Sequence, residues 1–216
     1  MAGKNKVVIF GDSYSTFDGW LPEGNAVYYA PGKRFSTDLE KVEQTWWHAC
    51  ARALDWDLVL NESWSGSTVC YTGWNGVDCS QTSSFIRRFR KLVAEDFFNK
   101  NGVDTVVVFG ATNDSWSNAP LGEMKYSDWQ EEDLYCVLPA VCYFAYSLKQ
   151  HLPNARIVFL VNSPLKPEVM DGIVQAAAYY GVESLVLQDI DKLEGHPTIK
   201  GMATICEQTV AFFKNK

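Results

Sequence analysis

The stretch Val7-Val8-Ile9-Phe10-Gly11-Asp12-Ser13-Tyr14-Ser15 decides how the rest of the chain is interpreted. Four apolar residues, two of them valine, lead directly into a Gly-Asp-Ser turn. A short, continuously apolar run of this kind is typical of a strand that is buried on both faces of a parallel sheet. Ser13 therefore lies just beyond the carboxyl end of a strand, which is where ligands bind in open α/β sheets. We treat Ser13 as a candidate nucleophile.

Further apolar runs of the same kind follow along the chain. They are Leu58–Leu60, Thr105–Phe109, Arg156–Val161 and Ser184–Leu187. Segments with helical periodicity separate them, and this alternation predicts βαβ units. We therefore predict an α/β fold, namely a three-layer α/β/α sandwich around a five-stranded parallel sheet in a flavodoxin-like strand order. Because the sequence contains no repeat, low-complexity segment or linker, it predicts one domain over residues 1–216.

The composition argues against several classes of partner. Hydrophobic residues make up 47% of the chain, which is enough for a full core, and the net charge of −7 argues against a nucleic-acid surface. No apolar stretch reaches the roughly 18 residues that a membrane span needs. The one basic cluster is interpreted as the solvated face of a helix over 85–98; it consists of Arg87, Arg88, Arg90 and Lys91. We expect no nucleic-acid and no membrane partner, and a monomer or a homodimer.

The six cysteines form no CxxC pair and no metal-ligand spacing with histidine. We interpret them as reduced core residues and predict neither a metal nor another cofactor. A loop disulfide between Cys70 and Cys79 is the alternative if the protein is exported. We find no signal peptide before the first strand, so we expect a cytoplasmic location, or export if a leader has been removed.

Polar residues stand at four of the predicted strand exits. They are Ser13, Ser65-Gly66, Asn113-Asp114 and His196. Because the exits of parallel strands face one edge of the sheet, residues far apart in sequence converge there. Acyl transfer needs such a set: a serine hydroxyl needs a base, and the tetrahedral intermediate needs donors aimed at its oxyanion. The exits therefore predict an acyl-transfer site.

The motifs at these exits resemble those of the SGNH (GDSL-type) hydrolase family. In chain order the resembling segments are Gly11-Asp12-Ser13-Tyr14-Ser15 (block I), Ser65-Gly66-Ser67-Thr68 (block II), Gly110-Ala111-Thr112-Asn113-Asp114 (block III) and His196-Pro197 (block V). Each motif alone is weak, but the ordered set spans nearly the whole chain. The resemblance implies an esterase of the fold predicted above.

The resemblance also implies a role for each residue. Ser13 would be the nucleophile, and its own N–H, the N–H of Gly66 and the side-chain amide of Asn113 would form the oxyanion hole. His196 would be the general base and then the acid that protonates the leaving alcohol. The chain has three histidines, and His196 alone lies in a predicted strand-exit loop, whereas His48 lies within a helix and His151 at a helix end.

One position departs from the family pattern. The family usually has an aspartate three residues before the histidine, where this chain has Leu193. A carboxylate behind the histidine fixes its tautomer and orientation. We take Glu194 and Asp191 as the candidate carboxylates, with a main-chain carbonyl as the alternative acceptor for the second ring nitrogen.

Aromatic residues make up 14% of the chain, and many of them fall in the loops at the strand exits. We name as candidate substrate contacts Asp12, Trp20, Trp64 and Trp116. The alternative is that these rings pack the loops against the sheet. We predict a serine esterase or deacetylase acting on a small-molecule or carbohydrate ester. The alternatives are a lysophospholipase, thioesterase or acyltransferase of the same fold, or a non-catalytic carbohydrate-binding protein.

Overall fold

A parallel five-stranded sheet forms the centre of the protein in a computed structural model that describes residues 3–32 and 37–215. Its strands are, in chain order, β1 (Asn5–Gly11), β2 (Trp56–Ser63), β3 (Thr105–Gly110), β4 (Arg156–Val161) and β5 (Glu183–Val186). The spatial order is β2-β1-β3-β4-β5, and every neighbouring pair is parallel. Each predicted apolar run overlaps one strand, so the predicted fold class and strand order are confirmed.

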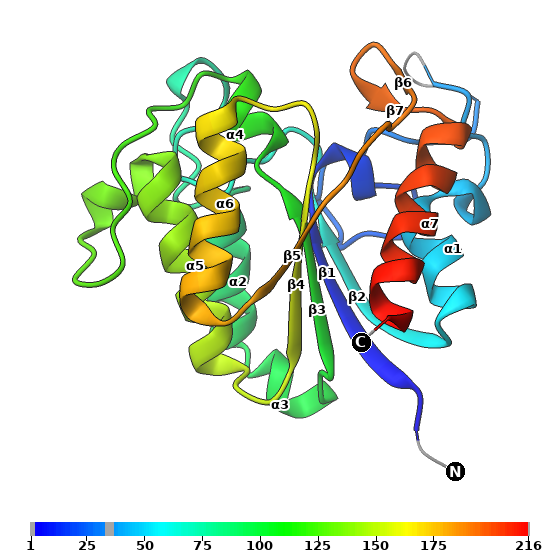
Figure 1. Ribbon diagram of the computed structural model, residues 1–216, viewed down its shortest axis with the longest axis horizontal. Coiled ribbons are helices and arrows are strands. Elements are labelled where there is room, and N and C mark those ends of the chain that lie inside the picture. The colour runs from blue at the N-terminus through cyan, green and yellow to red at the C-terminus, as the bar shows by residue number, and fades with distance from the viewer. Residues whose placement is uncertain (1–2, 33–36, 216) are drawn as a thin grey trace.

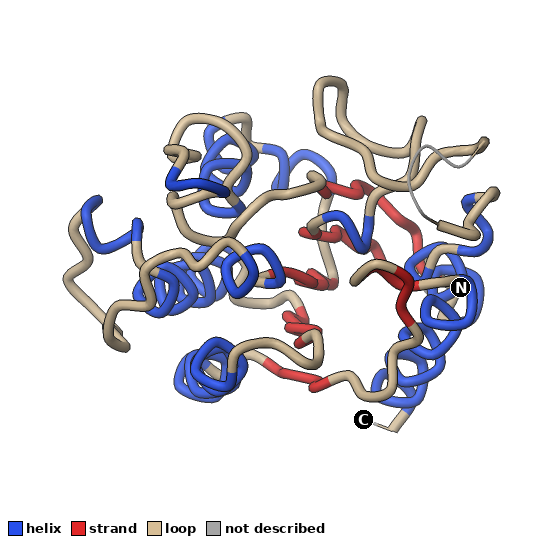
Figure 2. The backbone as a smooth tube through the Cα atoms, turned by 90° about the horizontal axis from the view of Figure 1, so that it is seen from above, coloured by secondary structure: helices blue, strands red, loops and turns tan. Residues whose placement is uncertain are grey.

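Helices cover both faces of this sheet (Figures 1 and 2). One layer contains α2 (Phe85–Ala94), α5 (Val137–His151) and α6 (Pro167–Tyr180), and the other contains α1 (Trp46–Ala53) and α7 (Ile199–Lys214). Shorter elements complete the chain: η1 (Ser13–Ser15), η2 (Val42–Gln44), η3 (Trp74–Gly76), α3 (Phe97–Asn101), α4 (Thr112–Trp116), η4 (Glu131–Tyr135), β6 (Lys192–Leu193) and β7 (His196–Pro197). Within the two described ranges, no helix is both long and apolar enough to cross a membrane.

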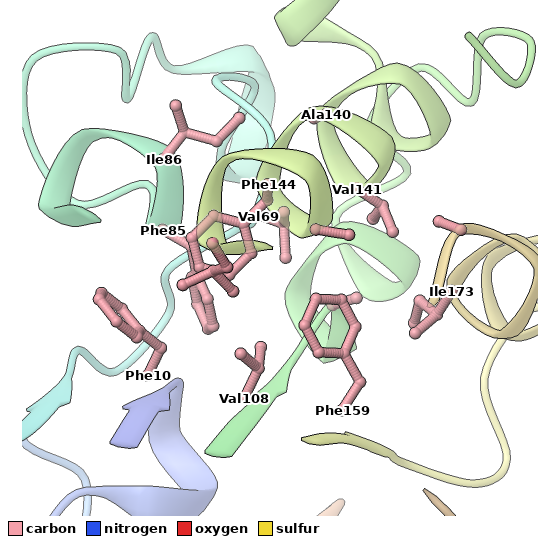
Figure 3. Packing of buried hydrophobic residues seen from close by; sticks show 14 of the residues in the cluster. Phe10, Val69, Phe85, Ile86, Val108, Ala140, Val141, Phe144, Phe159 and Ile173 are labelled. Atoms are coloured by element: carbon pink, nitrogen blue, oxygen red, sulfur yellow. The ribbon is translucent and has the colours of Figure 1, made fainter. Parts of the chain in front are cut away.

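The burial of β1 explains why its sequence is apolar at every position. Successive strand residues point to opposite faces of the sheet. Val8 and Phe10 join the core beneath α2 and α5, while Val7 and Ile9 join the core beneath α1 and α7. Figure 3 shows the ring of Phe10 on the first of these faces, within the cluster that fills the space between sheet and helices. The strand that leads to Ser13 is thus held from both sides.

The helical segment over 85–98 differs from its prediction in two ways. It breaks into α2 and α3 because Asp96 adopts a left-handed backbone conformation (φ 55°). In addition, Arg88 is only 3% exposed, so the interpretation of the basic cluster as a wholly solvated face is wrong at this position. The cation is tolerated inside because main-chain carbonyls surround it, as described below.

The cysteines are all free thiols, and each of the six lies in the described part of the chain. The alternative of a loop disulfide between Cys70 and Cys79 is therefore wrong. Both side chains are buried and lie close to main-chain oxygens, of Thr72 at 3.4 Å and of Val77 at 3.6 Å. They behave as small packing residues with weak S–H donors.

Candidate active site

Ser13 occupies the first turn after β1. The Oδ1 atom of Asp12 accepts the main-chain N–H of Tyr14 at 3.1 Å and so caps the short helix η1. The N–H of Asp12 donates to the carbonyl of Phe109 in β3 at 3.3 Å, which extends the sheet pairing to the residue before the serine. Ser13 itself is 4% exposed. The candidate nucleophile is thus fixed by the sheet and its cap.

Gly11 shows how closely this turn is packed. A Cβ atom at this position would lie 2.4 Å from Ser63 Oγ and 2.5 Å from Ser15 Cβ. Atoms that are not bonded to each other do not approach so closely. The end of the strand can therefore pack against Ser63 and Ser15 only if residue 11 has no side chain. The glycine of the first motif therefore serves the packing that places Ser13.

His196 reaches the same point from the other end of the chain. Its Nε2 atom lies 2.9 Å from Ser13 Oγ, within the reach that a general base requires. The residue lies in a short antiparallel hairpin of β6 and β7, where it pairs with Leu193. This hairpin lies at the end of the molecule where the parallel strands have their carboxyl ends (Figure 1). Two of the predicted site residues, 183 positions apart, are thus brought together.

A main-chain carbonyl faces the second nitrogen of this histidine. The carbonyl oxygen of Glu194 lies 3.3 Å from His196 Nδ1. The carboxylate of Glu194, on an exposed residue, forms no hydrogen bond or ion pair with any described residue. Asp191 points elsewhere, because its Oδ2 accepts the hydroxyl of Thr198 at the start of α7. The sequence left three acceptors open for His196 Nδ1: the carboxylate of Glu194, the carboxylate of Asp191 and a main-chain carbonyl. The structure shows the main-chain carbonyl in this position.

Three aromatic rings surround the His196 imidazole. The ring of Tyr28 stacks on it, with a centroid distance of 3.6 Å and an interplanar angle of 9°. Tyr14 lies tilted at 5.5 Å, and Trp116 meets it edge-on at 5.9 Å. Trp116, which we named as a substrate contact, therefore packs around the histidine. These contacts limit the orientations available to the imidazole.

Two tyrosine hydroxyls anchor the hairpin to the body of the protein. Tyr14 donates to the carbonyl of Gly195, and Tyr29 donates to the carbonyl of Pro197 at 2.8 Å. Both acceptors are immediate chain neighbours of His196. Because these tyrosines come from the region that follows β1, the loop beside Ser13 also positions the histidine.

A lysine makes a third anchor. Lys192 Nζ donates to Asn162 Oδ1 at 2.9 Å and to the carbonyl of Ser163 at 2.6 Å, both just beyond β4.

The pKa of His196 is lowered below its ordinary value, chiefly because the ring is buried. The Glu194 carbonyl opposes this change, and the positive charge of Lys192 adds to it. This shift favours the neutral imidazole, which is the form that accepts a proton.

Asn113 lies on α4, immediately after β3. Its Nδ2 donates to the carbonyl of Ser67 at 3.0 Å, while its Oδ1 accepts the indole N–H of Trp74 at 3.1 Å. These two bonds fix which end of the amide is the donor. A primary amide has two N–H groups, so one is left for a ligand. Ala111 supports this placement with a left-handed conformation (φ 65°) at the tight turn into α4, a kind of local strain that clusters at functional sites.

The Gly66 turn lies next to Asn113 along the sheet edge. Gly66 has a φ of +80°, and no heavy atom comes within 4 Å of the position that its Cβ would occupy. The left-handed conformation accounts for glycine here, and the open space leaves room for a substrate. Arg88 holds the turn from below, since its Nη2 donates to Ser67 Oγ at 3.1 Å and to the Gly11 carbonyl at 3.2 Å.

Asp114 braces the loop that follows. Its carboxylate accepts the main-chain N–H groups of Val69, at 2.8 Å to Oδ2, and Cys70, at 3.1 Å to Oδ1. Burial raises the pKa of this carboxyl, and the two main-chain donors oppose that rise. The residue thus has a structural position behind Asn113.

The remaining predicted contacts fall in three different places. Asp12 is completely buried, so the expectation that it touches substrate is wrong; burial raises its pKa to about 7. Trp20 is 48% exposed and packs on Trp47 and His48, whose ring centroids are 5.7 and 5.8 Å away. Trp64 lines an open cavity next to the Gly66 turn.

Four residues at the site were not singled out by the sequence. They are Tyr28, Trp74, Arg88 and Lys192. Tyr28 and Trp74 belong to the aromatic-rich loops, and that enrichment was the available signal. Arg88 and Lys192 gave no signal, because a buried cation is distinguished from a surface one only by acceptors contributed from other parts of the chain.

Comparison with known proteins gives a consistent result. The model of the GDSL-like lipase/acylhydrolase family matches residues 5–213. A protein assigned to the GDSL-like lipases from Bacteroides ovatus is 41% identical, each chain covers 100% of the other, and the TM-score is 0.92. Its counterpart from Bacteroides uniformis is 42% identical, with 99% of this chain and 97% of that chain covered and a TM-score of 0.92.

A more distant similarity extends to a carbohydrate-active enzyme. An acetyl xylan esterase from the rumen bacterium Butyrivibrio proteoclasticus is 19% identical, with a TM-score of 0.63 over 100% of this chain and 64% of that one. At this identity the similarity concerns the fold. No curated protein matches the chain significantly.

Proposed function

Because the chain belongs to the GDSL-like lipase/acylhydrolase family, we propose that it is a serine esterase that works through an acyl-enzyme on Ser13. The observation that carries this proposal is the 2.9 Å contact between Ser13 Oγ and His196 Nε2. A serine that merely capped a turn would not need a neutral imidazole at its hydroxyl. The same contact favours catalysis over a purely carbohydrate-binding role.

The proposed reaction proceeds in two steps of acyl transfer. His196 takes the proton of Ser13 as Oγ attacks the ester carbonyl carbon, and it returns that proton to the leaving alcohol when the carbon–oxygen bond of the ester breaks. Water then attacks the acyl carbon with His196 again as base, and the bond to Ser13 Oγ breaks as His196 returns the proton to that oxygen and the acid is released. The oxyanion formed in each step is stabilised by N–H donors of Ser13, Gly66 and Asn113.

We infer that the catalytic pair is a dyad. A hydrogen bond from Nδ1–H to the Glu194 carbonyl selects the tautomer in which Nε2 is free to accept the serine proton. Stacking on Tyr28 restricts the ring orientation. Together these two contacts supply the orienting part of the role that a carboxylate has in serine triads, without its negative charge.

The substrate that we propose is a small acyl ester, such as an acetyl ester. The acetyl xylan esterase of the same fold is consistent with a carbohydrate as the alcohol.

The test combines turnover and covalent labelling. We expect the protein to hydrolyse p-nitrophenyl acetate and to be labelled by a fluorophosphonate on the peptide that contains Ser13. The Ser13→Ala variant should lose both, whereas Ser65→Ala, which removes another hydroxyl from the same sheet edge, should retain both. Absence of turnover and labelling in the wild-type protein would reject the proposal, and labelling of Ser13→Ala would move the nucleophile elsewhere.

A further inference from the structure

An open cavity of about 340 Å³ lies beside the Gly66 turn, at the β2 edge of the sheet. Trp64 is one of the residues that line it. Its N–H donates to the carbonyl of Gly11 at 3.1 Å, and its own carbonyl accepts the hydroxyl of Ser67 at 2.7 Å. Trp64 therefore connects the strand end before Ser13 to the turn that carries Gly66. Through these two bonds of Trp64 the cavity adjoins both the Ser13 turn and the Gly66 turn.

The α2 wall of the cavity carries two unengaged cations. Arg87 and Lys91 are four residues apart, so their side chains lie on one side of the helix. Neither the guanidinium nor the ammonium group forms a hydrogen bond or ion pair with a residue in the described ranges. The Nε atom of Arg87 is moreover buried without a partner. Such a donor normally has a partner, and here a ligand in the cavity would supply it.

The other charges that line the cavity are already engaged. Glu62 is 7% exposed, and its Oε1 accepts the side-chain amide of Asn25 at 3.2 Å. The guanidinium of Arg88 donates to main-chain carbonyls, including those of Ser83 at 2.9 Å and Gly11 at 3.2 Å. Glu62 and Arg88 carry opposite charges and attract each other, so together they add no net charge to the cavity. The charge left for a ligand is therefore positive, in a chain whose net charge is −7.

We propose that this cavity binds a carboxylate carried by the substrate, so that the preferred substrates are acyl esters of acidic sugars. A guanidinium presents a planar pair of donors that matches a carboxylate, and a lysine adds a second cation. The indole of Trp64 offers an apolar face for a sugar ring. This inference rests on the proposed esterase function, since it concerns the alcohol part of the same ester.

The test uses a matched pair of substrates. A mono-acetylated methyl glucuronoside and the equally acetylated methyl glucoside differ only in a carboxylate that replaces a hydroxymethyl group. We expect the wild-type kcat/KM to favour the acidic substrate by about tenfold or more at low salt, a ratio typical of hydrogen bonds to charged groups. The preference should shrink in 1 M salt, where the screening length falls to about 3 Å.

Variants assign the preference to the cavity. In Arg87→Gln/Lys91→Gln the ratio should fall towards unity while hydrolysis of p-nitrophenyl acetate, which lacks the carboxylate, stays at the wild-type rate. Arg52→Gln removes an exposed cation from α1 and should leave the ratio unchanged.

The outcomes separate this inference from the proposed function. A wild-type ratio near unity, with p-nitrophenyl acetate still hydrolysed through Ser13, would overturn the carboxylate site and leave the esterase intact. A preference that survives in the double variant would also overturn it. Failure to hydrolyse any ester would overturn the proposed function itself.

Discussion

The Ser13 turn and the His196 hairpin meet at one hydrogen bond, yet they are held in place by different means. The turn follows β1, which pairs with β2 on one side and β3 on the other and is buried from Val7 onward. The hairpin consists of two strands of two residues that pair only with each other. It is tied to the protein by side chains, through the hydroxyls of Tyr14 and Tyr29 and the ammonium of Lys192.

The positions of the nucleophile and of the base are therefore set by different kinds of interaction. The position of Ser13 follows from the sheet and core, so changes near it are expected to affect stability as well as activity. The position of His196 depends on a few individual contacts, so changes there are expected to affect activity at nearly constant stability. The variants below test that distinction, from the largest expected effect to the smallest.

Removal of the base should have the largest effect of the set. We expect His196→Ala to lower kcat/KM for p-nitrophenyl acetate by about 10²–10⁴-fold, because general base catalysis typically contributes that much. The melting temperature should change less than in a variant of the sheet core, since the hairpin pairs with no strand of the main sheet. His151→Ala, at an exposed helix end, is the control and should keep full activity. Comparable losses in both variants would contradict the assignment of the base.

Loss of the amide donor should come next. We expect Asn113→Ala to lower kcat by about 10²–10³-fold with little change in KM, because the donor acts on charge that develops in the transition state. Trp74→Phe keeps an aromatic ring but removes the indole N–H bond that orients the amide. A lost hydrogen bond of ordinary strength corresponds to about 2–10-fold. If Trp74→Phe equalled Asn113→Ala, the indole would have a larger role than orientation.

The turn itself is tested by Gly11→Ala. The added methyl group would overlap Ser63 and Ser15, and overpacking of this kind costs about 1–3 kcal/mol of unfolding free energy. Activity should fall together with stability, because the same packing places Ser13. Denaturant unfolding and kcat/KM measure the two effects. Gly3→Ala, whose Cβ would have no neighbour within 4 Å, is the control. Lost activity at unchanged stability would contradict the proposed distinction.

A smaller effect should appear in the pH profile. Only neutral His196 accepts the serine proton, so kcat/KM should fall as the pH drops through its lowered pKa, below 6.5. In Lys192→Gln a positive charge near the imidazole disappears while a hydrogen-bond donor is kept, so the histidine pKa should rise and the acidic limb should move to higher pH.

The other titratable groups that face His196 are not expected to move the acidic limb of the pH profile. Burial raises the pKa values of Tyr14 and Tyr28, so both phenols are neutral throughout this range, and Glu194 is exposed. Lys200→Gln, an exposed lysine on α7, is the matched control. A limb that stays in place in Lys192→Gln, or moves equally in the control, would contradict the role of the Lys192 charge.

Sequence reasoning succeeded where the local pattern determines the structure. Continuous apolar runs identified the strands. The polar residues at their exits predicted Ser13, Gly66, Asn113 and His196 as a set, and the structure brings Ser13 and His196 into contact. Sequence reasoning did not resolve the partner of His196 Nδ1, because a main-chain carbonyl leaves no trace in residue identity. It also missed the stacking of Tyr28 on the imidazole of His196, 168 positions away. The hairpin that brings His196 there consists of two-residue strands, which are too short to show a hydrophobic period in the sequence.

The central claim is that His196 is oriented by a main-chain carbonyl and aromatic rings in place of a carboxylate. The most direct test is the kcat/KM of the double variant Glu194→Gln/Asp191→Asn with p-nitrophenyl acetate. Because neither carboxylate contacts the imidazole, we expect a value within about threefold of wild type, the range of a weak hydrogen bond or surface charge. A loss approaching the roughly 10⁴-fold seen when a triad carboxylate is neutralised would contradict the dyad.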